Sequence, residues 1–326
     1  MRPFAYVRAR TTDEALNAGR GERVRYLAGG TNLVDLMRIG VEEPAVVVDI
    51  TALPLAAIEP TRDGLRIGAL ARNTEVAWHP EVVSHFPALA LALRSGASPQ
   101  LRNMATVGGN LLQRTRCPYF RDGASPCNKR APGSGCAAWD GYNRSHAILG
   151  GGPRCIATHP SDMCVALAAL DARVLVRGPA GERAIPLTDF HLAPVDRPEI
   201  ETALAPGELV THVELPHAPW AARSTYVKVR DRASFAFALA SAAVGLQVEG
   251  GTIRAARVAI GGATTKPWRS HEAESALLGK PPSADAFRAA AAAAVEGAVA
   301  RAHNAFKVEL VRRTVVRALE TAGGLT

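Results

Sequence analysis

Short apolar runs alternate with helix-like segments over the first two thirds of the chain. Residues 24–28, 46–50 and 65–70 are compact apolar runs of the kind found in buried strands. Thr11 and Glu14 form a capping-box pattern, which predicts the start of a helix. This alternation of short strands and helices, without a long βαβ series, predicts an α+β fold.

The pattern changes near residue 218, where Pro216 and Pro219 interrupt it. Beyond these prolines, a β-hairpin that turns at Gly250-Gly251 is predicted. Three predicted helices follow, at residues 272–278, 283–301 and 305–322. We therefore expect two domains, at residues 1–218 and 222–326.

Residues 114–158 fit neither pattern, because they are rich in Pro, Gly, Arg and Cys and have no steady periodicity. A structureless loop of this length is unusual inside a domain unless something else organises it. All five cysteines of the chain fall between residues 117 and 164. A bound metal centre is one way to organise such an insertion.

Four of these cysteines are spaced widely along the insertion: Cys117, Cys127, Cys136 and Cys155. The spacing matches neither the close CxxC pairs of zinc sites nor the ferredoxin pattern, and disulfides or zinc remain alternatives. Residues 102–130 hold six basic side chains and one acid, which would stabilise an anionic cluster. We favour an iron–sulfur cluster held by four thiolates. Cys164 lies in an apolar helical turn and is expected to be a small buried side chain.

The composition narrows the remaining possibilities. The chain has 326 residues, of which 48% are hydrophobic and 21% charged, so it is not predominantly disordered. No apolar run is long enough to span a membrane, and the N-terminus has no pattern of a secretory signal. The net charge of +8 would allow nucleic-acid binding, but no basic run is interleaved with aromatic residues. We therefore expect that the chain does not bind nucleic acid.

Two glycine-containing turns are candidates for binding a diphosphate. Residues 27–33 form a strand-to-helix turn around Gly29-Gly30, and residues 105–110 present a similar turn around Gly108-Gly109. The first turn has neither the GxGxxG spacing of a Rossmann site nor the Lys-Ser/Thr of a P-loop. Glycines allow a backbone to approach an anion closely, so the two turns together could close around one diphosphate.

These turns belong to a larger set of motifs that resembles a known family. In order, the motifs are Ala28-Gly29-Gly30-Thr31-Asn32-Leu33, Ala105-Thr106-Val107-Gly108-Gly109-Asn110, His159-Pro160-Ser161-Asp162 and Tyr226-x-Lys228-x-x-x-Arg232. Together they resemble the flavin subunit of the molybdenum hydroxylases, the family of xanthine dehydrogenase and carbon monoxide dehydrogenase medium subunits. The cysteine-containing insertion resembles that of bacterial periplasmic aldehyde oxidoreductases, a branch with an additional [4Fe–4S] cluster.

The resemblance implies a fold and a set of site residues. The fold would be a two-subdomain, vanillyl-alcohol-oxidase (PCMH)-type FAD-binding domain, followed by an α+β domain of the carbon monoxide dehydrogenase flavoprotein C-terminal type. The residues implied to contact FAD are Leu27, Ala28, Gly29, Gly30, Thr31, Asn32, Leu33, Val34, Thr106, Val107, Gly108, Gly109, Asn110, Asp162, Leu209 and Lys228, with Arg232 near the flavin. The implied cluster ligands are Cys117, Cys127, Cys136 and Cys155.

The resemblance also implies an electron-transfer role within a complex. A molybdenum-cofactor large subunit and a [2Fe–2S] small subunit would be the partners, in a heterotrimer, and an external acceptor would receive electrons from FAD. The substrate class would be aldehydes, with no catalytic residue in this chain beyond the flavin. Periplasmic residence would require export on a partner's signal; otherwise the protein is cytoplasmic. The alternatives are a standalone flavin oxidoreductase and the FAD subunit of a xanthine or other N-heterocycle dehydrogenase.

Overall fold

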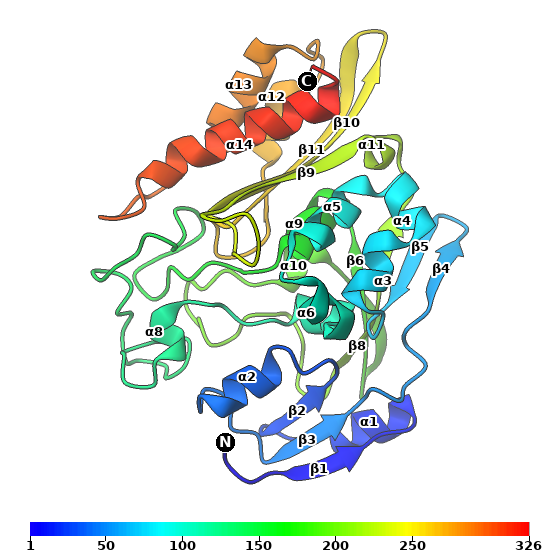
Figure 1. Cartoon of the computed structure of the whole chain (residues 1–326), viewed down its shortest axis with the longest axis vertical. Helices are drawn as coiled ribbons and strands as arrows, with labels where there is room; N and C mark the ends of the chain where they lie inside the picture. The colour runs from blue at the N-terminus through cyan, green and yellow to red at the C-terminus, as the bar shows by residue number, and fades with distance from the viewer. Residues whose placement is uncertain (326) are drawn as a thin grey trace.

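The computed structural model describes residues 1–325, which form three β-sheets and their covering helices (Figure 1). The first sheet is parallel, with strand order β1-β3-β2. Its elements, with the helices that follow β1 and β2, are β1 (Ala5–Arg8), α1 (Thr12–Ala18), β2 (Val24–Leu27), α2 (Leu33–Arg38) and β3 (Val46–Asp49). The Thr11 hydroxyl accepts a hydrogen bond from the Glu14 N–H at 3.2 Å, so the predicted cap begins α1.

The second sheet has five antiparallel strands in the order β4-β5-β8-β6-β7. Its strands are β4 (Ile58–Thr61), β5 (Gly64–Gly68), β6 (Arg173–Gly178), β7 (Gly181–Pro186) and β8 (Leu209–Pro216). The helices of this region are α3 (Asn73–Trp78), α4 (Pro80–His85), α5 (Pro87–Ser95), α6 (Pro99–Met104), α7 (Val107–Leu111), α9 (Asp162–Ala169) and α10 (Leu187–Phe190). Every residue of α9 is buried, because this helix lies in the centre of the largest hydrophobic core.

The insertion at residues 114–158 contains one short helix, α8 (Pro118–Arg121), and otherwise consists of turns and isolated bridges. Figure 1 shows it as a separate lobe at the side of the second sheet. Its lack of periodicity thus corresponds to irregular backbone in the structure. Irregular backbone makes few repeated hydrogen bonds, so side chains must hold this lobe in place.

The third sheet is antiparallel, with strand order β12-β11-β10-β9. Its elements and the helices around it are α11 (Pro219–Ala222), β9 (Ser224–Val229), β10 (Ala240–Glu249), β11 (Thr252–Gly261), β12 (Trp268–Arg269), α12 (His271–Leu277), α13 (Ala284–Ala293) and α14 (Phe306–Gly323). The predicted hairpin is present, with Gly250 and Gly251 at φ +57° and +75°. Helices α5 and α9 contact this sheet from the second region, and α14 packs against it along β10.

One predicted helix is shorter than expected. The sequence pattern predicted a helix over residues 283–301, whereas α13 ends at Ala293 and turns follow it. Gly297 adopts φ +74°, a left-handed conformation that a continuous right-handed helix does not contain. Among the described residues, no helix has both the length and the apolar character needed to cross a bilayer.

Candidate functional site

The two glycine turns lie against each other. A Cβ atom on Gly29 would lie 2.0 Å from the carbonyl oxygen of Met104, at the end of α6, so only glycine fits this contact. Gly30 adopts φ +71°, which also favours glycine. Because Met104 immediately precedes the second turn, the contact fixes the first turn beside the second.

Helix α7 begins within the second glycine turn. The Thr106 hydroxyl accepts a hydrogen bond from the Gly109 N–H at 3.2 Å and caps the helix. A Cβ on Gly108 would approach Ala69 to 3.1 Å, so the turn packs closely on the residue that follows β5. Both turns are therefore held in place by tight backbone packing.

A cavity of about 560 Å³ opens beside these turns, within the size range of small-molecule and cofactor sites. We call it the flavin cavity. The predicted residues that line it are Thr31, Asn32, Gly109, Asn110, Asp162, Lys228 and Arg232. The other ten predicted residues do not line it: Leu27, Ala28, Gly29, Gly30, Leu33, Val34, Thr106, Val107, Gly108 and Leu209, whose side chain is buried in the core beside the first sheet.

Three side chains lining the cavity, Asn32, Asn73 and Arg116, each have a buried polar atom without a partner. Asn32 Oδ1 accepts a hydrogen bond from the Arg114 N–H at 3.0 Å, but Asn32 Nδ2 has no acceptor. Asn73 Oδ1 likewise has no donor. Buried polar atoms normally have partners, so a polar ligand in this cavity would satisfy them. The close-packed glycine turns and the unpartnered amide fit a diphosphate-containing cofactor.

Asp162, at the start of α9, is the centre of a buried polar network. Its Oδ2 lies 2.7 Å from Lys228 Nζ, and the exposed fractions of the two side chains are 8% and 3%. Its Oδ1 accepts a hydrogen bond from the Tyr226 hydroxyl at 2.5 Å. Lys228 Nζ also donates to the Ser95 carbonyl at 3.1 Å. Tyr226 and Lys228 share one face of β9, and this period-two spacing is the sequence signal that could have identified Tyr226.

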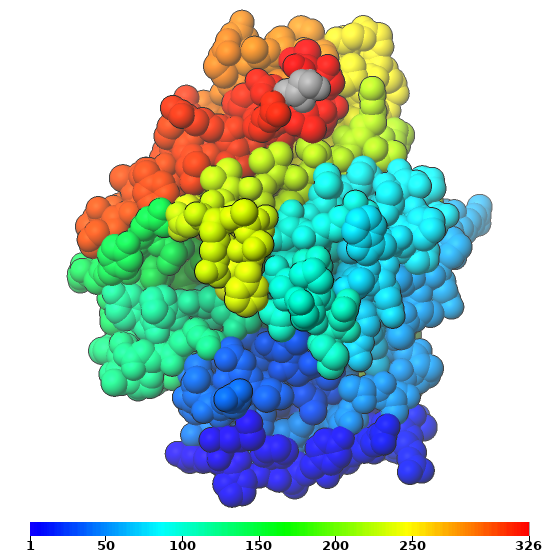
Figure 2. Space-filling model, in the orientation of Figure 1, coloured from blue at the N-terminus to red at the C-terminus, as the bar shows by residue number. Residues whose placement is uncertain are grey.

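A loop between β9 and β10 borders the flavin cavity. It carries Phe235 and Phe237, both about half exposed. Arg232 Nε donates to the Phe235 carbonyl at 3.0 Å, and the Arg116 guanidinium lies over the Phe237 ring. Figure 2 shows this segment extending from the third sheet over the surface of the second region. Arg232 therefore organises the loop as well as lining the cavity.

The four widely spaced cysteines line a second, smaller cavity, which we call the thiol cavity; they are Cys117, Cys127, Cys136 and Cys155. All are free thiols, so the disulfide alternative is not realised in the structure. Cys127 and Cys136 pair through an isolated β-bridge, and the Ser134 hydroxyl accepts a hydrogen bond from the Cys127 N–H at 3.0 Å. Residues far apart in an irregular segment thus converge on one point.

Burial raises the pKa of three thiols, to about 12 for Cys117, to about 11 for Cys155, and in the same direction for Cys136. Backbone N–H groups directed at the three sulfur atoms oppose this effect, as does the charge of Lys129 at Cys155. N–H groups that point at sulfur are a feature of protein sites that hold thiolates on a metal. The donor set therefore fits a thiolate-bound cluster.

The basic residues of the insertion have a role that sequence reasoning did not anticipate. Arg114 forms ion pairs with Glu42 and Glu201, at 2.6 and 2.5 Å. Arg116 and Arg121 both pair with Asp35 of α2. Their charges are thus largely matched by acids, and their main effect is to attach the insertion to the rest of the molecule.

Sequence reasoning also missed His146. Its Nε2 lies 3.1 Å from Cys117 Sγ, although 29 residues separate the two. Burial lowers the pKa of His146 to about 4. No periodicity or motif marks this residue, because its position depends on the path of an irregular loop.

Comparisons with known proteins agree with this geometry. Residues 2–218 match the FAD binding domain in molybdopterin dehydrogenase, and residues 225–322 match the CO dehydrogenase flavoprotein C-terminal domain. The chain is 48% identical to the aldehyde oxidoreductase FAD-binding subunit PaoB of Escherichia coli (strain K12), over 99% of each chain. It is 30% identical to the glyceraldehyde dehydrogenase medium chain of Sulfolobus acidocaldarius, over 85% of this chain and 82% of the relative.

A solved structure shares the whole fold. Carbon monoxide dehydrogenase from Hydrogenophaga pseudoflava contains a chain that superposes with a TM-score of 0.77 at 25% identity, covering 99% of each chain. The two family models together extend over both the glycine-turn region and the third sheet. This chain therefore belongs to the FAD-binding medium subunits of the molybdenum hydroxylase family, a family of oxidoreductases, as its motifs predicted.

Proposed function

We propose that this chain is the FAD-carrying electron-transfer subunit of a molybdenum-dependent aldehyde oxidoreductase. Electrons would arrive from the [2Fe–2S] centres of a partner and leave to an external acceptor. The 48% identity to an aldehyde oxidoreductase FAD-binding subunit supports this substrate class. The observation that carries the proposal is one cavity lined by both glycine turns and by the Asp162–Lys228 pair.

In this proposal the residues of the chain bind and orient the cofactor. Residues 27–34 and 106–110 hold the diphosphate through backbone N–H groups and the Asn32 amide. Asp162 fixes the ammonium group of Lys228 at the cavity wall, where its positive charge stabilises negative charge on a bound ring. Bound FAD supplies the two-electron redox chemistry.

Gly29→Ala tests the binding site. The added Cβ would collide with the Met104 carbonyl, so the turn must shift and FAD content should fall at least about tenfold, since a shift of about 1 Å has effects of that order or larger. Gly123→Ala is the matched control, because its Cβ would meet nothing within 4 Å. Flavin released from purified complexes is measured by absorbance. Equal flavin content in both variants would contradict the proposed site.

We also propose that Cys117, Cys127, Cys136 and Cys155 hold a [4Fe–4S] cluster. Support comes from their convergence on one cavity, their free thiols and the N–H groups directed at sulfur. Such a cluster would stabilise the insertion, because metal binding and folding are coupled when the ligands come from an irregular loop. Its bound iron and sulfide supply one-electron chemistry.

Cys127→Ser tests this assignment. We expect the loss of about four iron atoms and four sulfides per chain, because a [4Fe–4S] cluster needs four thiolates. Ser125→Ala is the control and should retain both, because this half-buried residue of the same insertion directs its hydroxyl to Asp122. Iron and sulfide are counted chemically, with FAD measured in the same samples. Full iron content in Cys127→Ser would overturn the ligand assignment.

The proposed partners are a molybdenum-cofactor large subunit and a [2Fe–2S] small subunit, with periplasmic residence after export on a partner's signal. The intact complex should bleach its flavin with aldehydes, and this chain alone should not. Bleaching by the isolated chain would instead support a standalone flavin oxidoreductase. Turnover of N-heterocycles but not of aldehydes would instead support the FAD subunit of an N-heterocycle dehydrogenase. One relative, 27% identical, has a name of this class: the nicotinate dehydrogenase FAD-subunit of Eubacterium barkeri.

A further inference from the structure

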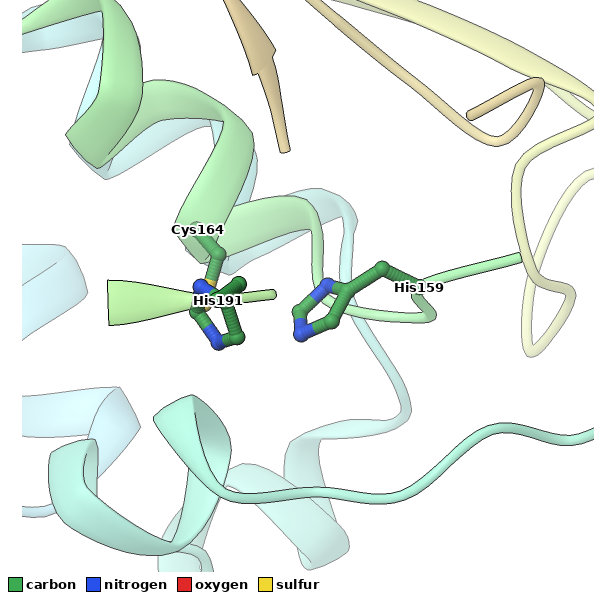
Figure 3. Close-up of side chains that lie close together, drawn as sticks. All are labelled: His159, Cys164 and His191. Carbon is green, nitrogen blue, oxygen red and sulfur yellow. The ribbon is translucent and has the colours of Figure 1, made fainter. Parts of the chain in front are cut away.

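Two histidines and one cysteine meet in the interior, separate from the linings of the flavin and thiol cavities (Figure 3). One potential ligand atom from each of His159, Cys164 and His191 lies within 4.8 Å of the other two. Within residues 1–325, this is the one group of three or more His, Cys, Asp or Glu side chains gathered so closely. His191 follows α10, whereas the other two flank the start of α9. Only the tertiary structure brings them together.

The group is buried and incompletely hydrogen-bonded. Cys164 is fully buried, and His191 is 3% exposed. His159 Nε2 and His191 Nδ1 are both shielded from solvent, and neither has a hydrogen-bond partner. Leaving a buried polar atom unpartnered lowers stability. Two such nitrogens beside one thiol therefore point to an occupant that contacts both rings.

The tautomer of His191 is suited to binding a cation. Its Nε2 lies 2.9 Å from the Leu111 carbonyl. A carbonyl only accepts hydrogen bonds, so the ring proton is on Nε2 and Nδ1 carries a free lone pair. Metal-binding histidines commonly donate their second nitrogen to a carbonyl in this way. Burial lowers the pKa of His191 to about 4, so the ring is neutral at pH 7.

His159 and Cys164 can supply the other two donors. His159 Nδ1 lies 3.4 Å from the Ser161 N–H, which is at the outer limit of a hydrogen bond. An ion on Nε2 needs the ring proton on Nδ1, where it would face the Ser161 N–H, so the ring would have to rotate away from this long contact. Cys164 would bind as a thiolate after releasing its proton.

We propose that His159, Cys164 and His191 bind one Cu⁺ ion. Metal–nitrogen bonds of about 2.0 Å and metal–sulfur bonds of about 2.3 Å place three coplanar donors about 3.5–3.7 Å apart. The observed limit of 4.8 Å is about 1 Å longer, which small rotations of the rings and the thiol can close. Thiolate and imidazole are the donors that copper and zinc prefer.

Charge and coordination number favour Cu⁺ over Zn²⁺. One thiolate neutralises Cu⁺, so the filled site would carry no net charge. Zn²⁺ would leave one uncompensated positive charge and would need a fourth ligand. Two cations disfavour further positive charge, Lys129 at His159 and Lys266 at His191. The carboxylate of Glu201 acts on His191 in the opposite sense, but it is already paired with Arg114 and Lys129, as Asp162 is with Lys228. Burying a neutral site costs less desolvation free energy than burying a charged one.

Such an ion would join elements that carry the proposed FAD residues. It would connect the start of α9, which contains Asp162, to the segment after α10. Through the Leu111 carbonyl, His191 also reaches the end of α7, which contains Asn110. The role inferred here is therefore structural support of the flavin cavity.

The test measures how much copper the full chain retains. The chain is loaded with Cu⁺ in the absence of oxygen, and bicinchoninate is present as a competing chelator. About one copper per chain is expected for a filled site. Cys164→Ala and His191→Gln should each reduce retained copper at least about tenfold, since each removes a ligand. Gly123→Ala serves as the control and should keep its copper, because the added Cβ meets nothing within 4 Å and every proposed ligand is retained. X-ray absorption at the copper edge should show two nitrogens and one sulfur.

Two results would overturn the proposal. If wild type retains no more copper than Cys164→Ala does, the three side chains are only an interior packing group. The same retention test is run with Zn²⁺ in the presence of a zinc chelator. If the chain retains zinc but not copper, the assignment of the ion as Cu⁺ is wrong. His159→Gln, with FAD content and circular dichroism measured in parallel, separates loss of the ion from loss of the fold. These measurements do not depend on enzyme activity, so they stand apart from the proposed function.

Discussion

At the scale of single residues, Asp162 connects parts of the molecule that are distant in sequence. Lys228 and Tyr226 reach it from β9, and the Ser95 carbonyl at the end of α5 shares the Lys228 ammonium group. These groups are buried, so each hydrogen bond acts in a medium of low dielectric constant. A single carboxylate thus fixes a positive charge at the wall of the flavin cavity.

Lys228→Met should lower the free energy of unfolding by about 3–5 kcal/mol, because it leaves the buried Asp162 carboxylate without its cation. Asp162→Asn should have an effect of similar size for the reciprocal reason. The double variant should recover part of the loss, since it removes both charges. Urea unfolding of the chain without flavin measures all three. Additive effects would show that the two side chains do not interact.

At the scale of elements, ion pairs attach the first part of the insertion, and backbone hydrogen bonds attach residues 148–149 to the region of the third sheet. Glu201 lies 2.5 Å from Arg114 Nε and 2.9 Å from Lys129 Nζ. Lys129, which is itself buried, also donates to the Pro198 carbonyl at 2.8 Å. The segment around residue 200 therefore holds the lobe at a second place, in addition to α2, where Asp35 pairs with Arg116 and Arg121.

Glu201 should make this attachment sensitive to acid. Burial alone would raise the pKa of Glu201, but the charges and hydrogen bonds of Lys129 and Arg114 outweigh burial and lower it. A lowered pKa adds stability that is complete above the ordinary Glu value of about 4.3 and is lost as the pH falls through the folded-state value. Stability should therefore decline below about pH 4.3 in wild type.

Glu201→Gln should be less stable at pH 7 and should show a weaker decline in acid, because the titrating group is gone. Thermal unfolding followed by circular dichroism between pH 3 and 7 measures both effects. Glu182→Gln, an exposed carboxylate on β7, is the control. A decline as steep in Glu201→Gln as in wild type would assign the acid sensitivity to other groups.

At the scale of the whole molecule, the third sheet lies between two sets of helices. Helices α5 and α9 contact it from the second region, and α14 packs against it along β10 (Figure 1). Arg269 strengthens this arrangement, because it donates to the Ala168 carbonyl and pairs with Asp171. The flavin cavity is therefore lined by residues from both family-model regions, which explains why neither region alone contains the site.

Structural features that depend only on residues close together in the chain could be predicted from the sequence. The Thr11 cap and the Gly250-Gly251 hairpin use contacts within a few residues, and the structure confirms them. The motif resemblance also identified the family, because glycine turns tolerate few substitutions where a Cβ would collide with backbone. The end of α13 was the exception, since the alanine-rich pattern continued past the point where the backbone turns.

Only the tertiary structure decided which distant residues meet. The sequence by itself determined the element types, the family and the residue types available for binding. It did not determine that Glu201 holds Arg114, that His146 contacts Cys117 or that Leu209 lies away from the flavin cavity. The physical reason is that local pattern is set by backbone and side-chain geometry within a few residues. Contacts across dozens of residues depend instead on how all the elements pack together.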